Sequence, residues 1–415
     1  MKKKVLASVL SVAMVATMMV GCGSSSSTTA ASSAAPAAAA SSAPAAAAST
    51  AAAATTASTA AATTAASTAA AATTASTATP NGKGLKFEIV SKGFQHQYWQ
   101  AVLKGANDEA EATGVGKANI NFVGPDSESD ISQQVQMMNN AINAKPNAIG
   151  LAALDTNALL DSIKQAQAAK LPIIGFDSGV PNAPAGAVLA NCSTDNYKAG
   201  ALAADNTYTA IKDQITGATK AVRIGVLSQD ATSESVCNRG LGFIDEIGTL
   251  AAKDGKTVAV TGNDKFVSDS KCTKVDKSKA NIIIEVLVPA QVDSALSATD
   301  CQTLENKADT IAIFGSNQHS GEAMVTADEN LSKFGTGSGK IVGVAFDSGT
   351  VIKGAVKSGE FLGAVTQAPV SIGKNLIDQL INSAKTGKAS NVDTGCQWYN
   401  SKNIADPTIS QNLYD

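Results

Sequence analysis

The motif Phe-Asp-Ser-Gly occurs twice in this chain, and each copy ends an apolar run, at residues 173–179 and 342–349. A short apolar run bounded by glycine and serine, set among helical patterns, predicts a buried parallel strand. Asp177 and Asp347 then lie at the carboxyl edge of a sheet, where open α/β sheets bind ligands. Because the copies lie about 170 residues apart, they predict two similar lobes whose carboxylates line one cleft.

Apolar runs alternate with helical stripes throughout residues 85–415. Strands are predicted at residues 87–90, 120–123, 148–152, 171–176 and 188–190, and a second series of strand–helix units begins at residue 221. Residues 191–196 predict a polar turn, and the Lys/Asp-rich residues 262–280 an insertion or a hairpin. Short connections favour parallel sheets with right-handed crossovers. The predicted fold class is α/β, with two similar Rossmann-like lobes joined by a hinge of several segments.

The first 22 residues are typical of a secretory leader. Three lysines, Lys2, Lys3 and Lys4, precede an apolar run at residues 5–20 that is too short to span a membrane. Residues 19–22 resemble the lipobox of bacterial lipoproteins. This resemblance implies that Cys22 becomes the lipidated first residue of the mature chain. The alternative is a plain signal peptide with an unrelated cysteine.

Residues 23–84 are interpreted as a linker. Residues 23–79 are almost entirely Ala, Ser, Thr, Gly and Pro, without charge or large apolar side chains. Such a segment cannot bury a core, so it is predicted to be disordered. As a flexible coil it spans roughly 40 Å on average. That reach suits a tether that holds a folded domain away from a membrane.

Charge and cysteine content exclude several function classes. The formal net charge is −3, and without the three leader lysines residues 81–415 carry −6, which argues against nucleic acid as a partner. Five cysteines follow Cys22 without a C-x-x-C pair, which argues against a zinc site. Their pairing stays open, although Cys272 and Cys301 are nearest in sequence. No cofactor and no metal are expected.

Polar side chains follow several other predicted strands. Asn317 follows the run at residues 311–314, Gln367 follows 363–365, and Asp155 follows 149–154. Arg239, one of only two arginines, lies in the segment R-G-L-G-F after the strand that starts the second unit. Near the first strand, residues 95–99 read Q-H-Q-Y-W and bring amides, an imidazole and two aromatic rings together.

From about residue 85 to its end, the chain resembles type I periplasmic sugar-binding proteins, the ribose- and galactose-binding kind that serves ABC importers. The resemblance rests on Tyr98-Trp99, both strand-end aspartates, Arg239-x-x-Gly-Phe, Ser316-Asn317 and Gln367-x-Pro. It implies sugar contacts by Tyr98, Trp99, Asp177, Arg239, Asn317, Asp347 and Gln367, and a polar contact by His96. The chain departs from the family at residues 151–155, which lack an Asn-Pro, and at Ser178, where some relatives have Arg.

The resemblance implies an extracytoplasmic receptor, lipid-anchored at the outer face of the cell membrane, that closes on a monosaccharide and delivers it to ABC transporter permease subunits. A monomer is expected. The implied lobes are residues 85–192 plus 367–395 and residues 193–366 plus 396–415, with crossings near 191–195, 367 and 395–398. An autoinducer-2-like furanose, a nucleoside or a polyol remains an alternative ligand.

The residue types fit a sugar on chemical grounds as well. Carboxylates accept hydrogen bonds from vicinal hydroxyls, while Arg and carboxamides donate in planar forks. Aromatic rings pack against the apolar C–H face of a sugar. Enzymes are disfavoured, because no G-x-S-x-G elbow, Walker A loop or metal-spaced His/Cys set occurs. A lactose-repressor-type regulator is disfavoured too, because a leader and a neutral linker occupy the place of a DNA-binding head.

Overall fold

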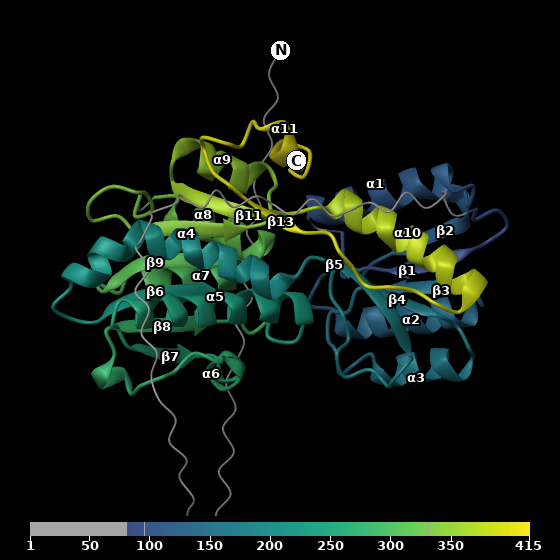
Figure 1. Ribbon diagram of the computed structural model, residues 1–415, viewed down its shortest axis with the longest axis horizontal. Helices are drawn as coiled ribbons and strands as arrows, with labels where there is room; N and C mark the ends of the chain where they lie inside the picture. The colour runs from purple at the N-terminus through teal and green to yellow at the C-terminus, as the bar shows by residue number, and fades with distance from the viewer. Residues whose placement is uncertain (1–80, 95, 331) are drawn as a thin grey trace, which may run out of the picture. The chain divides into compact units, whose positions relative to one another are not determined.

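The computed structural model describes residues 81–94, 96–330 and 332–415, which all belong to one compact unit. These residues form two β-sheets, each with its own helices, and so two lobes (Figure 1). The predicted α/β fold with two mainly parallel sheets is therefore confirmed. The leader, Cys22 and the linker up to residue 80 lie outside the described residues. Within the described part, no helix is both long and apolar enough to cross a membrane.

The first lobe is built on a six-stranded sheet in the order β12-β5-β4-β3-β1-β2, with every neighbouring pair parallel. Its strands are β1 (Phe87–Val90), β2 (Ile120–Val123), β3 (Ala148–Leu151), β4 (Ile173–Phe176), β5 (Val188–Ser193) and β12 (Val392–Asp393). Its helices are α1 (Gln97–Ala112), α2 (Ile131–Asn143), α3 (Leu160–Ala168) and α10 (Pro369–Thr386), with a 3₁₀ turn at Lys117–Asn119.

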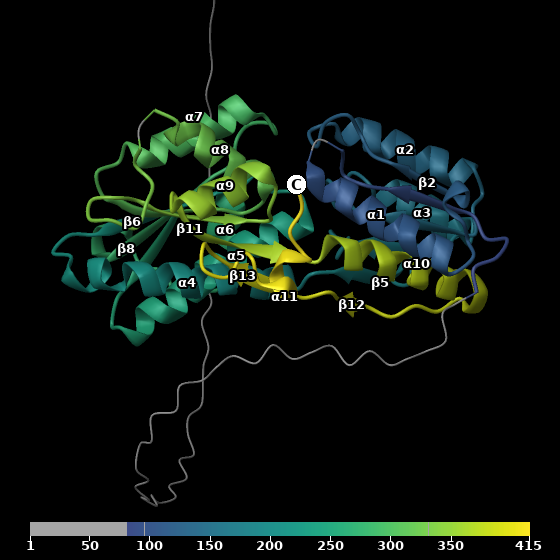
Figure 2. The same cartoon turned by 90° about the horizontal axis from the view of Figure 1, so that it is seen from above.

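Both faces of this sheet are apolar because both are covered. Phe87 and Ile89 of β1 belong to the cluster that packs with α1 and α10. Val90 of the same strand and Ile149 of β3 belong to the cluster under α2 and α3. Successive side chains of a strand point to opposite faces, so a doubly covered strand reads as a continuous apolar run. Figure 2 shows α10 lying beside α1.

The second lobe is built on a seven-stranded sheet in the order β13-β11-β10-β9-β6-β8-β7, in which only the β11–β13 pair is antiparallel. Its strands are β6 (Val222–Leu227), β7 (Val258–Gly262), β8 (Ile282–Leu287), β9 (Thr310–Gly315), β10 (Val342–Phe346), β11 (Phe361–Gln367) and β13 (Cys396–Tyr399). Its helices are α4 (Asn196–Gly217), α5 (Glu234–Lys253), α6 (Asp264–Asp269), α7 (Ser294–Glu305), α8 (Gln318–Asp328), α9 (Thr350–Ser358) and α11 (Pro407–Ser410), with a 3₁₀ turn at Lys277–Lys279.

The chain passes between the two sheets three times. It leaves the first sheet after β5 and enters α4, it leaves the second sheet after β11 and enters α10, and it returns from β12 to β13. Each connection is only a few residues long, and the three lie beside one another at the same side of the lobes (Figures 1 and 2). Three short adjacent connections allow the lobes to rotate about one axis while each keeps its own core.

Two glycines bring α4 and α5 into backbone contact. A Cβ atom on Gly200 would lie 2.0 Å from the carbonyl oxygen of Arg239, and one on Gly242 would lie 2.0 Å from that of Tyr197. Any larger residue would force the helices apart. This close approach places the first turns of α5, and Arg239 with them, at the edge of the sheet that faces the other lobe.

The predicted turn at 191–196 was wrong in its first half. Residues 191–193 continue β5, because β5 pairs on one side with β4 and on the other with β12, about 200 residues later. Of the two alternatives predicted for 262–280, the hairpin is wrong, because the segment contains α6 and a 3₁₀ turn, and Phe266 of α6 is buried against Gly240 of α5. The five cysteines of the described residues are free thiols.

Candidate functional site

A narrow pocket with a cavity volume of about 30 Å³ lies between the lobes. We call it the inner pocket. It is lined by Lys92, His96, Tyr98, Trp99, Glu128, Asp177, Val236, Arg239, Asn317, Gln318, Asp347 and Gln367. The structure therefore brings all eight predicted site residues together. Asp155 is not among them, since it accepts hydrogen bonds from the backbone N–H groups of Asn157 and Ala158 in its own turn.

The two predicted aspartates have the same unusual backbone. Asp177 has φ of +56° and Asp347 has φ of +72°, in the left-handed region that non-glycine residues seldom occupy. The N–H of Asp177 donates to Cys192 O on the neighbouring strand at 3.0 Å, and that of Asp347 donates to Val365 O at 2.7 Å. The backbone thus turns sharply at the end of each of the two strands, and the carboxylate that follows lies in the pocket. Strained backbone of this kind is typical of functional sites.

Asp177 is held by two residues of its own lobe. The Tyr98 hydroxyl donates to Asp177 Oδ1 at 2.6 Å, and the Lys92 ammonium lies 3.5 Å from Oδ2. The same ammonium also donates to the hydroxyls of Ser233 and Ser235 in the second lobe, at 3.3 and 3.4 Å. Burial lowers the pKa of Lys92, but the carboxylates of Asp177 and Glu128 outweigh burial, so its pKa is raised overall and it stays charged. Lys92 thus links Asp177 to the opposite lobe.

Asp347 is held by donors from its own sheet edge and from α5. Gln367 Nε2 donates to its Oδ1 at 2.7 Å, while the Gln318 N–H and Arg239 Nη1 donate to its Oδ2 at 3.2 and 3.4 Å. Burial raises the pKa of this carboxyl, and the Arg239 guanidinium opposes the shift. The carboxylate therefore depends on its donors to remain charged.

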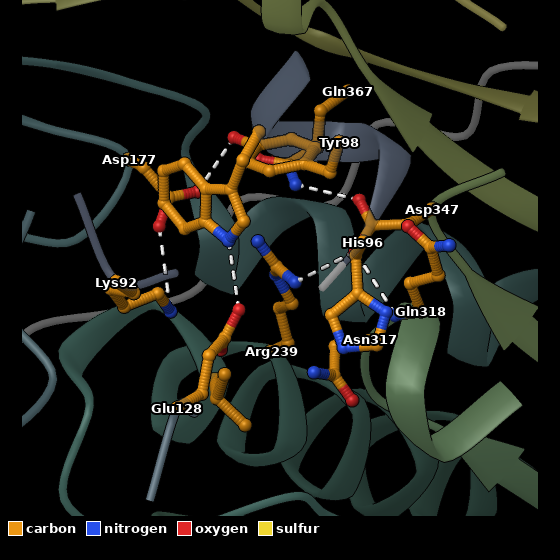
Figure 3. Close-up of a pocket in the computed structure, with 12 residues that line it drawn as sticks. Lys92, His96, Tyr98, Glu128, Asp177, Arg239, Asn317, Gln318, Asp347 and Gln367 are labelled. Atoms are coloured by element: carbon orange, nitrogen blue, oxygen red, sulfur yellow. Dashed lines mark hydrogen bonds and ion pairs between the residues drawn. The ribbon is translucent and has the colours of Figure 1, made fainter. Parts of the chain in front are cut away.

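Arg239 occupies the centre of the pocket, between Asp177 and Lys92 on one side and Asp347 and Gln318 on the other (Figure 3). Its Nε donates to Asn196 Oδ1 at 2.8 Å, which fixes the plane of the guanidinium. Its Cζ lies 4.1 Å from the centre of the Phe346 ring, a stacked arrangement that excludes water from one face. A guanidinium held this way presents fixed donors to a ligand.

Two buried oxygens of the inner pocket, Gln318 Oε1 and Gln367 Oε1, accept no hydrogen bond from the protein. A third, Asp177 Oδ2, faces only the Lys92 ammonium, at the long distance of 3.5 Å. Because buried polar groups are almost always hydrogen-bonded, these atoms need donors from whatever fills the pocket. Hydroxyl groups are such donors, and a carboxylate or phosphate group is not. The pocket is therefore suited to a polyhydroxylated ligand.

Comparison with known proteins agrees with this geometry. Residues 87–389 match the model of the periplasmic binding protein domain. The chain belongs to this family. The predicted resemblance to type I periplasmic sugar-binding proteins is thereby confirmed at the level of the family, whose members bind substrates outside the cytoplasm.

Individual relatives of this periplasmic binding protein cover most of the chain. A solved structure from Brachyspira murdochii, described as an ABC transporter, LacI family transcriptional regulator, is 32% identical, with 80% of this chain and 99% of that one covered and a TM-score of 0.65. An ABC transporter solute-binding protein from Agrobacterium vitis, solved with bound D-fucose, is 26% identical, with coverage of 79% and 100% and a TM-score of 0.64. The D-allose-binding periplasmic protein of Escherichia coli (strain K12) is 23% identical over 318 residues, 74% of this chain and 87% of that protein.

The two histidines lie next to each other in this periplasmic binding protein, one from each lobe. The rings of His96 and His319 are 5.9 Å apart, and His96 Nδ1 lies 3.9 Å from Glu322 Oε2. His319 does not line the inner pocket but is buried against Ser297, whose hydroxyl lies 2.9 Å from its Nε2. Burial, with His96 nearby, lowers the pKa of His319 to about 4. Among the described residues, no group of His, Cys, Asp and Glu could hold a metal ion.

Sequence reasoning missed three polar residues of the pocket: Lys92, Glu128 and Gln318. Lys92 follows β1 as the predicted residues follow their strands, and Gln318 adjoins Asn317, so the same strand-end rule applied to every strand finds both. Glu128 gives no such signal, since it lies in the loop between β2 and α2. Both its oxygens are engaged, by Trp99 Nε1 at 2.8 Å and Gln229 Nε2 at 2.9 Å.

Proposed function

We propose that this protein is an extracytoplasmic solute-binding protein that captures a monosaccharide in the inner pocket and delivers it to the permease of an ABC transporter. The observation that carries the proposal is the convergence, from both lobes, of paired carboxylates, a fixed guanidinium and oxygens that lack a donor from the protein. A sugar supplies hydroxyl donors and acceptors around one small ring, which is the pattern these groups demand. Relatives solved with D-fucose and D-arabinose support the ligand class.

Within this proposal, each predicted site residue has a role that its contacts support. Asp177 and Asp347 accept from ligand hydroxyls, Arg239 donates, and Gln367 accepts through the oxygen that has no donor from the protein. Tyr98 and Trp99 are packed edge to face with ring centres 5.0 Å apart, and they offer an aromatic wall to the sugar ring. Asn317 and His96 complete the polar lining. The protein acts by binding and release, without chemistry on the ligand.

The membrane anchor is a separate part of the proposal. We propose that Cys22 is lipidated, that the linker spaces the binding domain from the outer face of the cell membrane, and that the protein acts as a monomer. The lipobox-like residues 19–22 and the charge-free residues 23–79 support the anchor. Replacement of Cys22 by Ala is expected to release the protein from the membrane fraction into the soluble fraction. Persistence of the variant in washed membranes argues against the anchor and leaves sugar binding untouched.

A thermal-shift screen of the purified protein tests the ligand class. The panel contains pentoses, hexoses, 6-deoxyhexoses, polyols, ribonucleosides, an autoinducer-2-type furanose and sugar acids. A ligand at 100 times its Kd adds about 2.7 kcal/mol to the free energy of unfolding. We expect stabilisation by at least one neutral monosaccharide and none by its uronic acid, followed by a Kd from isothermal titration calorimetry. A flat response to every sugar refutes the proposal, while a response confined to nucleosides, polyols or the furanose selects that alternative.

A further inference from the structure

A second cavity lies next to the inner pocket and shares Glu128 with it. We call it the outer cavity. Its cavity volume is about 310 Å³, and it is lined from both lobes, by apolar residues that include Leu154, Val288 and Val292 and by Gln229. Together with the inner pocket it offers more room than one sugar ring fills. What separates the two spaces therefore decides how large a ligand the protein accepts.

The separation is a row of four hydrogen-bonded side chains, which we call the partition: Trp99, Glu128, Gln229 and Asn317. Trp99 Nε1 donates to Glu128 Oε1 at 2.8 Å, and Gln229 Nε2 donates to Glu128 Oε2 at 2.9 Å. Asn317 Nδ2 then donates to Gln229 Oε1 at 2.6 Å. None of the four side chains is more than 8% exposed. Figure 3 shows Glu128 and Asn317 on either side of Arg239.

The direction of every bond in the partition is determined. A carboxylate only accepts, so Gln229 must turn its amide nitrogen toward Glu128 and its oxygen toward Asn317. Asn317 in turn must point its oxygen at the Ser320 N–H, which donates to it at 3.0 Å, and its nitrogen at Gln229. The partition therefore has one hydrogen-bond arrangement, and a side chain that moves out of it leaves a buried polar partner unpaired.

The partition is assembled from both lobes. Trp99 and Glu128 come from the first lobe, whereas Gln229 and Asn317 follow β6 and β9 of the second. The bond between Glu128 and Gln229 thus forms only when the lobes are together. A ligand with a substituent that points at this bond would hold the lobes apart or displace a buried carboxylate from its donors, and both outcomes weaken binding.

We propose that Glu128 and Gln229 set the size limit of the ligand: the partition admits a single unsubstituted ring and rejects derivatives extended toward the outer cavity. The inference rests on the proposed function and adds residues that determine specificity. It also assigns the outer cavity a ligand class, the substituent of a glycoside, which becomes accessible once the partition is opened.

The test compares the parent monosaccharide from the thermal-shift screen with its methyl glycosides, its mono-O-methyl ethers and a disaccharide, by isothermal titration calorimetry. The proteins are the wild type, Gln229→Ala, Gln229→Asn and Gln291→Ala. Gln291 is an exposed residue that lines the outer cavity but not the partition, and so serves as the matched control. Gln229→Asn keeps an amide in the partition and shortens it by one methylene, which guards against a fold defect in Gln229→Ala.

We expect the wild type and Gln291→Ala to bind the parent sugar and to bind the derivative extended toward the partition roughly 10- to 100-fold more weakly, the scale of an overpacked site. Gln229→Ala is expected to bind that derivative with a Kd within about tenfold of its Kd for the parent sugar. Gln229→Asn is expected to fall between the wild type and Gln229→Ala. Equal wild-type affinity for the parent, every derivative and the disaccharide overturns the inference. So does a folded Gln229→Ala that binds the parent but gains affinity for no derivative. Failure of every monosaccharide to bind the wild type overturns the proposed function itself. This outcome differs from failure of the size-limit inference, in which the wild type still binds the parent sugar.

Discussion

Replacement of Asp347 by Asn removes the charge of one strand-end carboxylate and little else. The residue has φ of +72°, a region that Asn occupies more readily than most residues, so the substitution adds little backbone strain. The side chain keeps its size and stays buried. What changes is the hydrogen-bond capacity, because the carboxylate accepts from Gln367, from the Gln318 N–H and from Arg239.

The expected cost follows from that change. An Asn amide has one accepting oxygen, so in either orientation its NH₂ group faces a donor, either Gln367 Nε2 or the Arg239 and Gln318 N–H groups. Hydrogen bonds to a charged group contribute about 1.5–3 kcal/mol each. If one ligand hydroxyl donates to this carboxylate, the ligand loses about 1.5–3 kcal/mol, a roughly 10- to 100-fold rise in Kd.

Isothermal titration calorimetry with the sugar from the screen measures the effect, and a melting curve of each protein without sugar verifies that it is folded. The matched control is Asp155→Asn, which changes another carboxylate that follows a strand but lies outside the pocket and caps its own turn. We expect the control to leave the Kd unchanged within twofold. A folded Asp347→Asn protein that binds the sugar with the wild-type Kd refutes the reasoning, since it leaves the carboxylate without a role in the site.

Three further perturbations test neighbouring parts of the molecule. Lys92→Met removes the ammonium that joins Asp177 to the second lobe, and calorimetry is expected to show a roughly 10- to 100-fold weaker complex; an unchanged Kd contradicts this role. Burial lowers the pKa of His319 to about 4, below the value of about 6.5 in the unfolded chain. The unfolded chain therefore binds a proton first, and the free energy of unfolding falls by about 3 kcal/mol as the pH drops from above 6.5 toward 4. Melting temperatures of His319→Gln should fall less over that range, and parallel curves for both proteins would exclude this origin. Burial and the nearby Glu109 raise the pKa of the partly exposed Asp378 to about 6, so its charge destabilises the fold above that pH. Asp378→Asn should add roughly 1 kcal/mol to the free energy of unfolding at pH 8 and nothing at pH 4. Equal gains at both pH values would contradict the assignment.

The strand-end rule accounts for part of what sequence reasoning found, and the family resemblance supplied the sugar-binding roles. Asp177, Asp347 and Gln367 were predicted as site residues because each follows or ends an apolar run, and parallel strands bring their carboxyl ends to one edge. That geometry is local to each strand–turn unit, so it is readable without knowledge of the tertiary structure. Arg239 was identified by the segment R-G-L-G-F, and its role came from the family resemblance.

What sequence reasoning missed depends on pairs far apart in the chain. Glu128 lines the pocket because Trp99 and Gln229 fix it, and Gln229 lies 101 residues away. The extension of β5 depends on β12 in the same way, since Cys192 pairs with Val392. No short sequence pattern predicts such a partner, because each of these residues, taken alone, is an ordinary side chain of a loop or an edge strand.

Ligand binding and lobe closure are coupled through three pocket oxygens, two without a donor from the protein and one, Asp177 Oδ2, that faces only the Lys92 ammonium. Asp177 Oδ2 belongs to the first lobe, Gln318 Oε1 to the second, and Gln367 Oε1 to the end of β11 where the chain crosses over. With the lobes apart, water can donate to all three. With the lobes together, each buried acceptor without a donor costs about 1–3 kcal/mol.

A sugar whose hydroxyls reach all three oxygens removes that cost only in the closed form. Because the Lys92 ammonium already faces Asp177 Oδ2, only Gln318 Oε1 and Gln367 Oε1 count in full. The gain is roughly 2–6 kcal/mol, which reaches the about 5.5 kcal/mol that moves a two-state equilibrium from 1:99 to 99:1. A ligand that reaches the acceptors of one lobe alone binds the open and closed forms with nearly equal affinity, and therefore does not shift the equilibrium between them. A sugar acid adds a negative charge to a pocket in which Lys92 and Arg239 already pair with Asp177 and Asp347, so it should fail at closure even where it fits in size.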